Sequence, residues 1–306
     1  MSISIFNIYL LLVSGLLFPG EKTPVPESPA GPEAEYWFRG KAEISSYDLE
    51  QARYGEIHQG EAVLVFVTED FSRSKHVKLD YPEKDPADAV KVMKLNFMKN
   101  FLTGIYPYSM MSSTFTPYYY EKESGTLKVS SSVQEWCGNA FTQLNLRNGR
   151  YEGVLYSYFE SEGDQNFSIS KTWLEDEIWN LIRVAPDKLP VGDFTMIPGV
   201  FYQRLSHKTL KREEVTAGFI KGNSEDTRIY SLQYNKTGRT LHIEYRKEYP
   251  HEIEGWEEQH TSGYGAGKEG LVTRANKKAT IFTDYWNQNS VADISVRKQL
   301  KLEIPD

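Results

Sequence analysis

The stretch from Gly104 to Cys137 constrains the fold of this chain more than any other part of the sequence. It contains two extended segments, 105–115 and 126–136, which are joined by a polar tip that includes Gly125. In the second segment, Leu and Val at 127, 129 and 133 alternate with Lys, Ser and Gln, which is the period of two of a strand with one buried face. We therefore expect a long antiparallel hairpin with the rest of the chain built around it.

The remainder of the chain also favours strands. Tyr (20) outnumbers Phe (15), which suits sheets with one packed face and one wet face. We expect strands near 36–46, 49–57, 61–69, 87–100, 150–161, 193–206 (with a break at Pro198-Gly199), 212–221, 227–234, 240–249 and 271–285, and a loop at 80–88. The 150–161 strand follows a strong turn signal, Asn148-Gly149, and is expected beside the first hairpin. In the second half, turn residues at 222–224, 235–238 and 262–267 indicate an antiparallel meander rather than βαβ units.

One segment has the pattern of an amphipathic helix. Between Trp173 and Arg183, apolar residues at 174, 178, 181 and 182 share one helical face. Thr172 is placed to cap the helix, and Pro186 lies just past its end. We expect this helix to lie across the sheet with Trp173 and Trp179 as packing anchors.

The tail at 289–302 fits either a short helix capped by Ser290 or a final strand. Together, these patterns predict a single mainly β domain over residues 36–306. The expected architecture is one large, antiparallel, curved sheet, either an open half-barrel or barrel-like, with one or two covering helices.

The N-terminus predicts export. Residues 1–18 hold an apolar run that is better sized for a signal peptide than for a membrane-spanning helix, with an N-terminal anchor as the alternative. Residues 19–35 form a Pro-rich linker. We expect a secreted, periplasmic or cell-envelope protein that contacts the membrane only through its N-terminal segment. The net charge of −7 and the absence of a basic stripe argue against nucleic acid as a partner.

Cys137 is the only cysteine, so the chain forms no intramolecular disulfide and carries no CxxC motif. Free cysteines are usually buried, so a buried thiol at a strand end is the favoured interpretation. A reactive thiol is the alternative, although the six histidines show no spacing typical of a nucleophile and its base.

Two acidic clusters invite chemical hypotheses. Residues 251–260 contain two His and four Glu, but their spacing matches no standard zinc motif, so a solvated acidic loop or edge strand is favoured over a metal site. Glu175, Asp176 and Glu177 offer paired carboxylates for a glycosidase, but they are more simply the acidic first turn of the helix. Residues 263–270 are Gly-rich without a phosphate-binding pattern, and no cofactor is expected.

The candidate ligand site is a groove on the hairpin and helix. Long aromatic and Met side chains line adaptable apolar grooves, although core packing is the favoured role for such residues. The residues concerned are Tyr106, Tyr108, Met110, Met111, Trp136, Trp173 and Trp179.

Several stretches carry a family resemblance. They read YWFRGKAEISSYDLEQARYGE, KNFLTGIYPYSMMSSTFTP, SSVQEWCG, LEDEIWNLIR and DYWNQNSVADISVRKQLKL. Together they resemble a family of exported bacterial envelope proteins of uncharacterised function, some of which carry the label septum formation inhibitor Maf. The resemblance implies export and a single long domain over most of 36–302. It implies no activity, since the S-x-R-R motif of Maf pyrophosphatases is absent and no catalytic residue is carried over.

The sequence therefore favours a non-enzymatic binding module of the cell envelope. Its expected partner is a lipid or other apolar or amphiphilic ligand, or an envelope protein. The alternative is a cell-envelope hydrolase that uses Cys137 or the carboxylates of Glu175 to Glu177.

Overall fold

A computed structural model describes residues 31–262 and 269–303 of the chain. The apolar N-terminal run and residues 19–30 of the expected linker lie outside the described residues, as do residues 263–268 of the Gly-rich segment. The last part of the expected linker, from Pro32, is helical.

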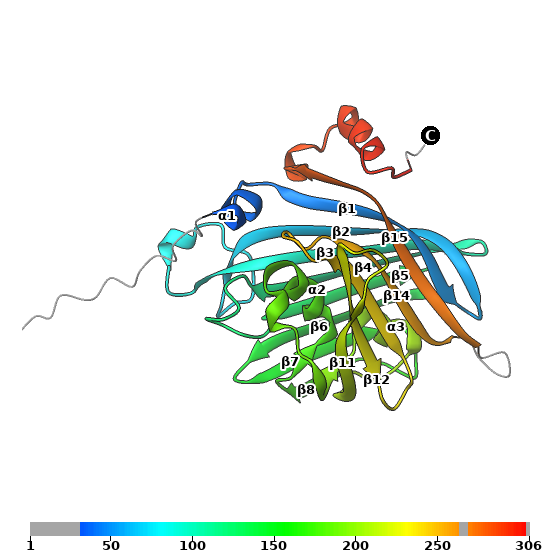
Figure 1. Ribbon diagram of the computed structural model, residues 1–306. Helices are drawn as coiled ribbons and strands as arrows, with labels where there is room; N and C mark the ends of the chain where they lie inside the picture. Colours follow the sequence, from blue (N-terminus) through cyan, green and yellow to red (C-terminus); the bar gives the residue numbers. More distant parts are fainter. Residues whose placement is uncertain (1–30, 263–268, 304–306) are drawn as a thin grey trace, which may run out of the picture.

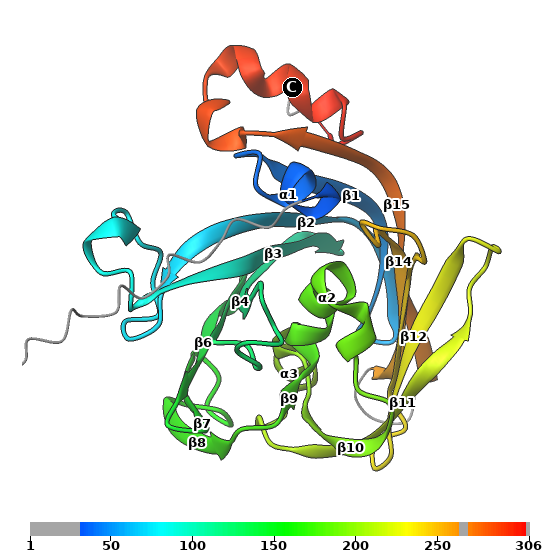
Figure 2. The same ribbon diagram turned by 60° about the vertical axis from the view of Figure 1, so that its left-hand side comes forward.

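The described chain forms one curved sheet of fifteen strands with a few short helices, which confirms the predicted fold class (Figures 1 and 2). The strands are β1 (Ala42–Arg53), β2 (Glu56–Ser72), β3 (Ala89–Thr103), β4 (Tyr106–Pro117), β5 (Lys128–Glu135), β6 (Gly138–Arg147), β7 (Arg150–Ser157), β8 (Gln165–Ser170), β9 (Trp173–Leu174), β10 (Gly192–Ile197), β11 (Glu213–Lys221), β12 (Thr227–Tyr234), β13 (Thr240–Arg246), β14 (Ile253–Ser262) and β15 (Glu269–Thr283). The α-helices are α1 (Pro32–Trp37), α2 (Glu175–Val184) and α3 (Val200–Ser206), and the 3₁₀ helices are η1 (Pro82–Lys84), η2 (Pro186–Lys188), η4 (Tyr285–Asn287) and η5 (Val291–Lys298).

The strands follow the order β8-β7-β6-β5-β4-β3-β2-β1-β15-β14-β13-β12-β11-β10-β9. Two meanders, β1 to β8 and β10 to β15, meet where β1 pairs with β15. All neighbours are antiparallel except the two-residue β9, which runs parallel to β10. β8 forms one edge of the sheet, since it pairs only with β7 among the described residues.

The sheet curves around α2 and α3, so that these two helices fill its concave side (Figure 2). The main core lies there, where inward residues of both meanders meet α2. In β3 and β4, buried and more exposed residues alternate, which directs one face of each strand toward the helices. The concave side is therefore packed with protein rather than open.

The predicted hairpin is confirmed. β4 and β5 pair in antiparallel register from Ser109↔Gln134 to Phe115↔Lys128, and β3 leads into β4 as expected. The 150–161 strand exists as β7, but the prediction that it lies beside this hairpin was wrong. β6, which the sequence analysis did not identify, lies between β5 and β7.

Three other expectations were wrong. The two strands expected at 36–46 and 49–57 are instead the end of α1, one continuous strand β1 and, after a turn, the first residues of β2. The strand expected at 193–206 ends at Ile197, just before its expected break at Pro198-Gly199, and the part after the break is α3, from Val200, rather than a strand. The expected acidic loop or edge strand at 251–260 contains β14, a strand with a neighbour on each side.

The helix predicted near 173–183 is α2, but it begins after Leu174. Thr172 does not cap it, because its hydroxyl hydrogen-bonds with Thr195, with 3.1 Å between the two side-chain oxygens. Trp179 is buried in the core, and Trp173 packs against the core while partly exposed. In the described part of the chain, no helix is long and apolar enough to cross a membrane.

The helical alternative for the tail is confirmed as η5, with Ser290 at its start. The Ser290 hydroxyl and backbone N–H both donate to the carboxylate of Asp293, at 2.6 and 2.9 Å. Beyond η5, Leu300 and Leu302 pack on Val65 and neighbouring residues of β1 and β2. The tail therefore lies on the outer face of the sheet (Figure 1).

Candidate functional site

The seven residues of the candidate groove do not form one surface. Tyr108 and Met110 are each 1% exposed, and Trp179 also belongs to the core. Met111 is 39% exposed because alternation along β4 turns it to the outer face. Core packing, the favoured role, therefore applies to Tyr108, Met110 and Trp179.

The remaining aromatics of the hairpin gather at one end of the sheet. Trp136 is 69% exposed in the turn between β5 and β6, and its ring lies 6.2 Å from that of Tyr106. The hydroxyl of Tyr106 donates to that of Tyr54 at 3.2 Å, and the hydroxyls of Tyr54 and Tyr108 lie 2.6 Å apart. Trp173 is elsewhere, stacked near Tyr120. The structure thus brings Tyr106, Tyr108 and Trp136 together and separates them from Trp173.

The favoured interpretation of Cys137 as a buried thiol was wrong, because the β5–β6 turn exposes it. Its backbone N–H donates to the Glu135 carboxylate at 2.6 Å. A hydrogen bond to Glu135 and the negative charge of that residue raise the pKa of the Cys137 thiol. No histidine among the described residues hydrogen-bonds to it, so the geometry gives no support to a nucleophile.

The acidic first turn of α2 is enclosed by the protein rather than solvated. The Glu177 carboxylate accepts a hydrogen bond from the Tyr120 hydroxyl at 2.8 Å, and Asp176 accepts one from the Val200 N–H at 3.2 Å. Burial raises the pKa of Glu177 to about 7, and burial with the charge of Glu175 raises that of Asp176 to about 7. Glu175 pairs with an arginine, so each of the three carboxylates has a partner within the protein.

That arginine, Arg239, is the centre of a buried ionic network. It donates to Glu175 at 2.7 Å through Nη2 and to Glu258 at 2.7 Å through Nε. Burial alone would raise the pKa of Glu258, but the positive charges of Arg239, His260 and Lys99 lower it to about 2. This explains why Glu258 points inward from β14, where the sequence analysis expected a solvated surface.

Lys99 completes this interior. It is 3% exposed, and its ammonium nitrogen lies 5.5 Å from the ring centre of Phe97 and 5.6 Å from that of Phe201. Burial lowers the pKa of Lys99. A cavity of only about 30 Å³ remains beside these groups, well below the roughly 300–1,000 Å³ of small-molecule pockets. This cavity beside Lys99 is therefore too small for an organic ligand.

A larger hollow lies where η2 and the chain after it pass β11, β12 and β13. It measures about 350 Å³, and we call it the mouth cleft. Its lining residues are Pro186, Asp187, Leu189, Val191, Phe219, Arg228, Tyr245, Lys247 and His251. Val191 and Phe219 are 61% and 39% exposed, so part of its apolar wall is open to solvent.

Strand register explains how these residues meet. Tyr230 and Leu232 face the core from β12, so Arg228 faces the same inner side at the strand's start. Arg228 pairs with Tyr245 of β13 in register, and its guanidinium carbon lies 4.9 Å from the ring centre of Phe219. The cleft is thus built at the end of two neighbouring strands.

The charges of the mouth cleft are unbalanced. Neither Arg228 nor Lys247 forms a salt bridge with a carboxylate of the described residues, although Lys247 donates a hydrogen bond to the carbonyl oxygen of Glu225. The carboxylate of Asp187 is paired instead with Lys188, at 3.0 Å. Burial lowers the pKa of His251, which favours its neutral form near pH 7. Two cations without carboxylate partners therefore border an apolar wall.

Sequence reasoning missed this cleft because its residues come from separate segments, with no local motif. No group of three or more His, Cys, Asp or Glu side chains within 31–262 and 269–303 is arranged to hold a metal ion.

Comparison with known proteins gives no identification. No family model matches the chain, and neither a curated protein nor a solved structure matches it significantly.

Proposed function

We propose that this protein is a non-enzymatic binding module of the cell envelope that takes an anionic amphiphile in its mouth cleft. The observation that carries the proposal is the pair of cations, Arg228 and Lys247, which lack carboxylate partners beside an apolar wall. A carboxylate or phosphate head group would supply the missing partner. An acyl or similar apolar tail would cover the exposed Val191 and Phe219.

The size of the cleft supports a small ligand. A volume of about 350 Å³ lies at the lower end of the range for small-molecule pockets. The apolar N-terminal run supports export, which would bring the protein to a compartment bounded by lipids. The thiol and the α2 carboxylates give the alternative of a hydrolase no comparable support, since neither opens onto a cleft of this size.

Binding of a fluorescent fatty acid tests the proposal. The double variant Arg228→Ala, Lys247→Ala should bind dansyl-undecanoic acid at least about tenfold more weakly than the wild type, because each charge-assisted hydrogen bond contributes about 1.5–3 kcal/mol. Fluorescence titration measures the affinity. The matched control is Lys298→Ala, which removes an exposed lysine from η5 and should leave binding unchanged.

A second probe separates the head group from the tail. The corresponding fluorescent alcohol lacks the anion, so it should bind the wild type more weakly than the acid and should be insensitive to the double substitution. Phe219→Ser should weaken both probes. The proposal fails if the wild type shows no saturable binding, or if the acid and the alcohol bind equally well.

A further inference from the structure

The outer face of β4 to β8 carries a row of exposed apolar side chains. Met111, Phe141 and Tyr156 are 39%, 36% and 50% exposed. Register places them in line across the strands, with Met111 opposite Ser132, Ser132 opposite Phe141, and Phe141 opposite Tyr156. The Cβ atoms of directly opposite residues lie about 5 Å apart in a sheet, so Phe141 and Tyr156 are neighbours on the outer face.

Uncharged polar side chains border this row. On one side lie Ser109, Gln134 and Asn139, and on the other lie Ser113, Ser130, Gln143 and Asn166. Neither Gln143 nor Asn166 forms a side-chain hydrogen bond within the described residues. Each amide can donate and accept at the same time, which is also what a sugar hydroxyl does.

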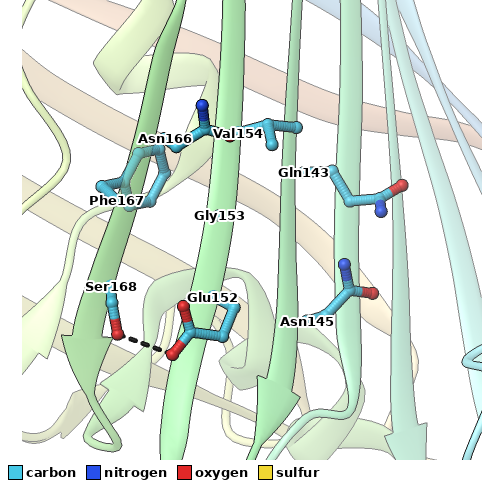
Figure 3. A pocket seen from close by; sticks show the side chains of 8 residues that line it. All are labelled: Gln143, Asn145, Glu152, Gly153, Val154, Asn166, Phe167 and Ser168. Carbon is cyan, nitrogen blue, oxygen red and sulfur yellow. Dashed lines mark hydrogen bonds between the residues drawn. The ribbon is translucent and has the colours of Figure 1, made fainter.

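A surface trough of about 460 Å³ adjoins the row (Figure 3). Two parallel rows of side chains line it, Gln143–Val154–Asn166 and Asn145–Glu152–Ser168. The Ser168 hydroxyl donates to the Glu152 carboxylate at 2.7 Å, which leaves the carboxylate further lone pairs for hydroxyl donors (Figure 3). At one end of the trough, the side chain of Asn145 lies 3.2 Å from His76 of the loop between β2 and β3.

The chemistry of this face discriminates among partners. A lipid surface or an apolar protein interface would be matched by a contiguous apolar patch, whereas here a single row lies between polar rows. A polyanion would be matched by clustered Lys and Arg, whereas the trough is lined by amides, a hydroxyl, two apolar residues and one carboxylate. Flat rings between uncharged donors and acceptors complement a pyranose, which has apolar C–H faces and a rim of hydroxyls.

We infer that this outer face binds a neutral glycan chain. The rings of Phe141 and Tyr156 stack on successive sugar faces, and Gln143, Asn166 and Glu152 hydrogen-bond the hydroxyls along the trough. The site lies on the opposite face of the sheet from the mouth cleft, so it is independent of the proposed function.

Affinity electrophoresis in gels containing soluble polysaccharides tests this site. We expect the wild type to be retarded by at least one of three neutral polymers, a β-glucan, a xylan and a galactomannan, but not by anionic polygalacturonate. Tyr156→Ala and Phe141→Ala should each weaken the retarding interaction about tenfold, which corresponds to about 1.4 kcal/mol, because each removes a ring on which a sugar can stack. Gln143→Ala with Asn166→Ala should weaken it as well.

Conservative variants and controls keep the test specific. Tyr156→Phe keeps the ring and should still be retarded, whereas Tyr156→Leu keeps apolar area without a ring and should not be. Trp286→Ala removes a similarly exposed aromatic from η4 and should leave retardation unchanged, as should the double substitution of Arg228 and Lys247. The inference is overturned if no neutral polymer retards the wild type, if only polygalacturonate does, or if Tyr156→Leu behaves like the wild type.

Discussion

At the scale of single residues, Glu177 shows how the fold uses its buried acids. The side chain is 1% exposed at the start of α2, and burial raises its pKa to about 7. An unfolded chain releases this proton near the ordinary value of about 4.5. Between those two pH values the folded protein holds a proton that the unfolded chain has lost, so stability falls as the pH rises.

Glu177→Gln should therefore change the pH dependence of stability. The amide keeps an oxygen acceptor for Tyr120 but has no charge to bury. We expect the variant to be more stable than the wild type at pH 8 by on the order of 3 kcal/mol, and nearly equal to it below about pH 4.5. Urea unfolding at both pH values measures the difference. Glu214→Gln, at an exposed carboxylate, is the control, and equal stabilities at pH 8 would refute the account.

Residue roles were only partly predictable from the sequence. The α2 carboxylates were recognised as a helix start, but their burial depends on Arg239 and Tyr120, which are distant in the chain. Cys137 was expected to be buried because free cysteines usually are, whereas the tight β5–β6 turn forces it outward. Partners from distant segments decide such environments, and a single sequence does not show them.

At the scale of elements, alternation predicted several strands whose inward positions are mainly apolar. The β4–β5 hairpin and β11, β12 and β13 are examples. β14 was predicted as a solvated loop or edge strand because its inward positions include the charged Glu258. A register shift between Glu244 and Tyr245 of β13 also interrupts its pairing with β13. α3 was misjudged because its residues, VFYQRLS, are largely apolar and aromatic, which favours a strand by local preference.

The β7–β8 edge offers a test of packing between elements. A Cβ at Gly153 would lie 2.3 Å from a ring carbon of Phe167, so Gly153→Ala forces the ring to move. We expect a loss of about 1–3 kcal/mol in unfolding free energy, measured by urea denaturation. Gly218→Ala is the matched control, since a Cβ there meets nothing within 4 Å. If steric conflict is the cause, Gly153→Ala should cost much less in a Phe167→Ala background, and an unchanged cost would contradict it.

At the scale of the whole molecule, α2 connects the two meanders. Asn180 donates to the carbonyl oxygens of Met93 and Thr114 in the first meander, at 3.1 and 3.3 Å. Glu175 at the other end of the helix pairs with Arg239, between β12 and β13 of the second. The two meanders pair strand to strand through β1 and β15, whose paired residues are far apart in sequence. Helix α2 therefore stabilises the β1–β15 pairing, which is entropically costly to form because its residues are far apart in the chain.

Arg239→Leu should destabilise the whole molecule. It leaves the carboxylates of Glu175 and Glu258 buried without a counter-charge, which costs about 3–5 kcal/mol. Adding Glu175→Gln and Glu258→Gln should restore much of that loss. The control is Arg274→Leu, which breaks an exposed pair with Glu257 and should cost less than about 1 kcal/mol. Thermal unfolding followed by circular dichroism measures all four proteins, and equal losses for the two arginines would contradict the account.

The end of the sheet at β8 has a consequence for self-association. A free strand edge is a template on which another chain can add a strand, and this can lead to aggregation. Arg150 extends from β7 over this strand and donates to the hydroxyls of Ser168 and Ser170, at 2.6 and 3.0 Å. An incoming strand would meet a fixed guanidinium and a serine-rich segment with little apolar surface. The open β8 edge can thus remain exposed to water without pairing with a strand of another copy of the protein.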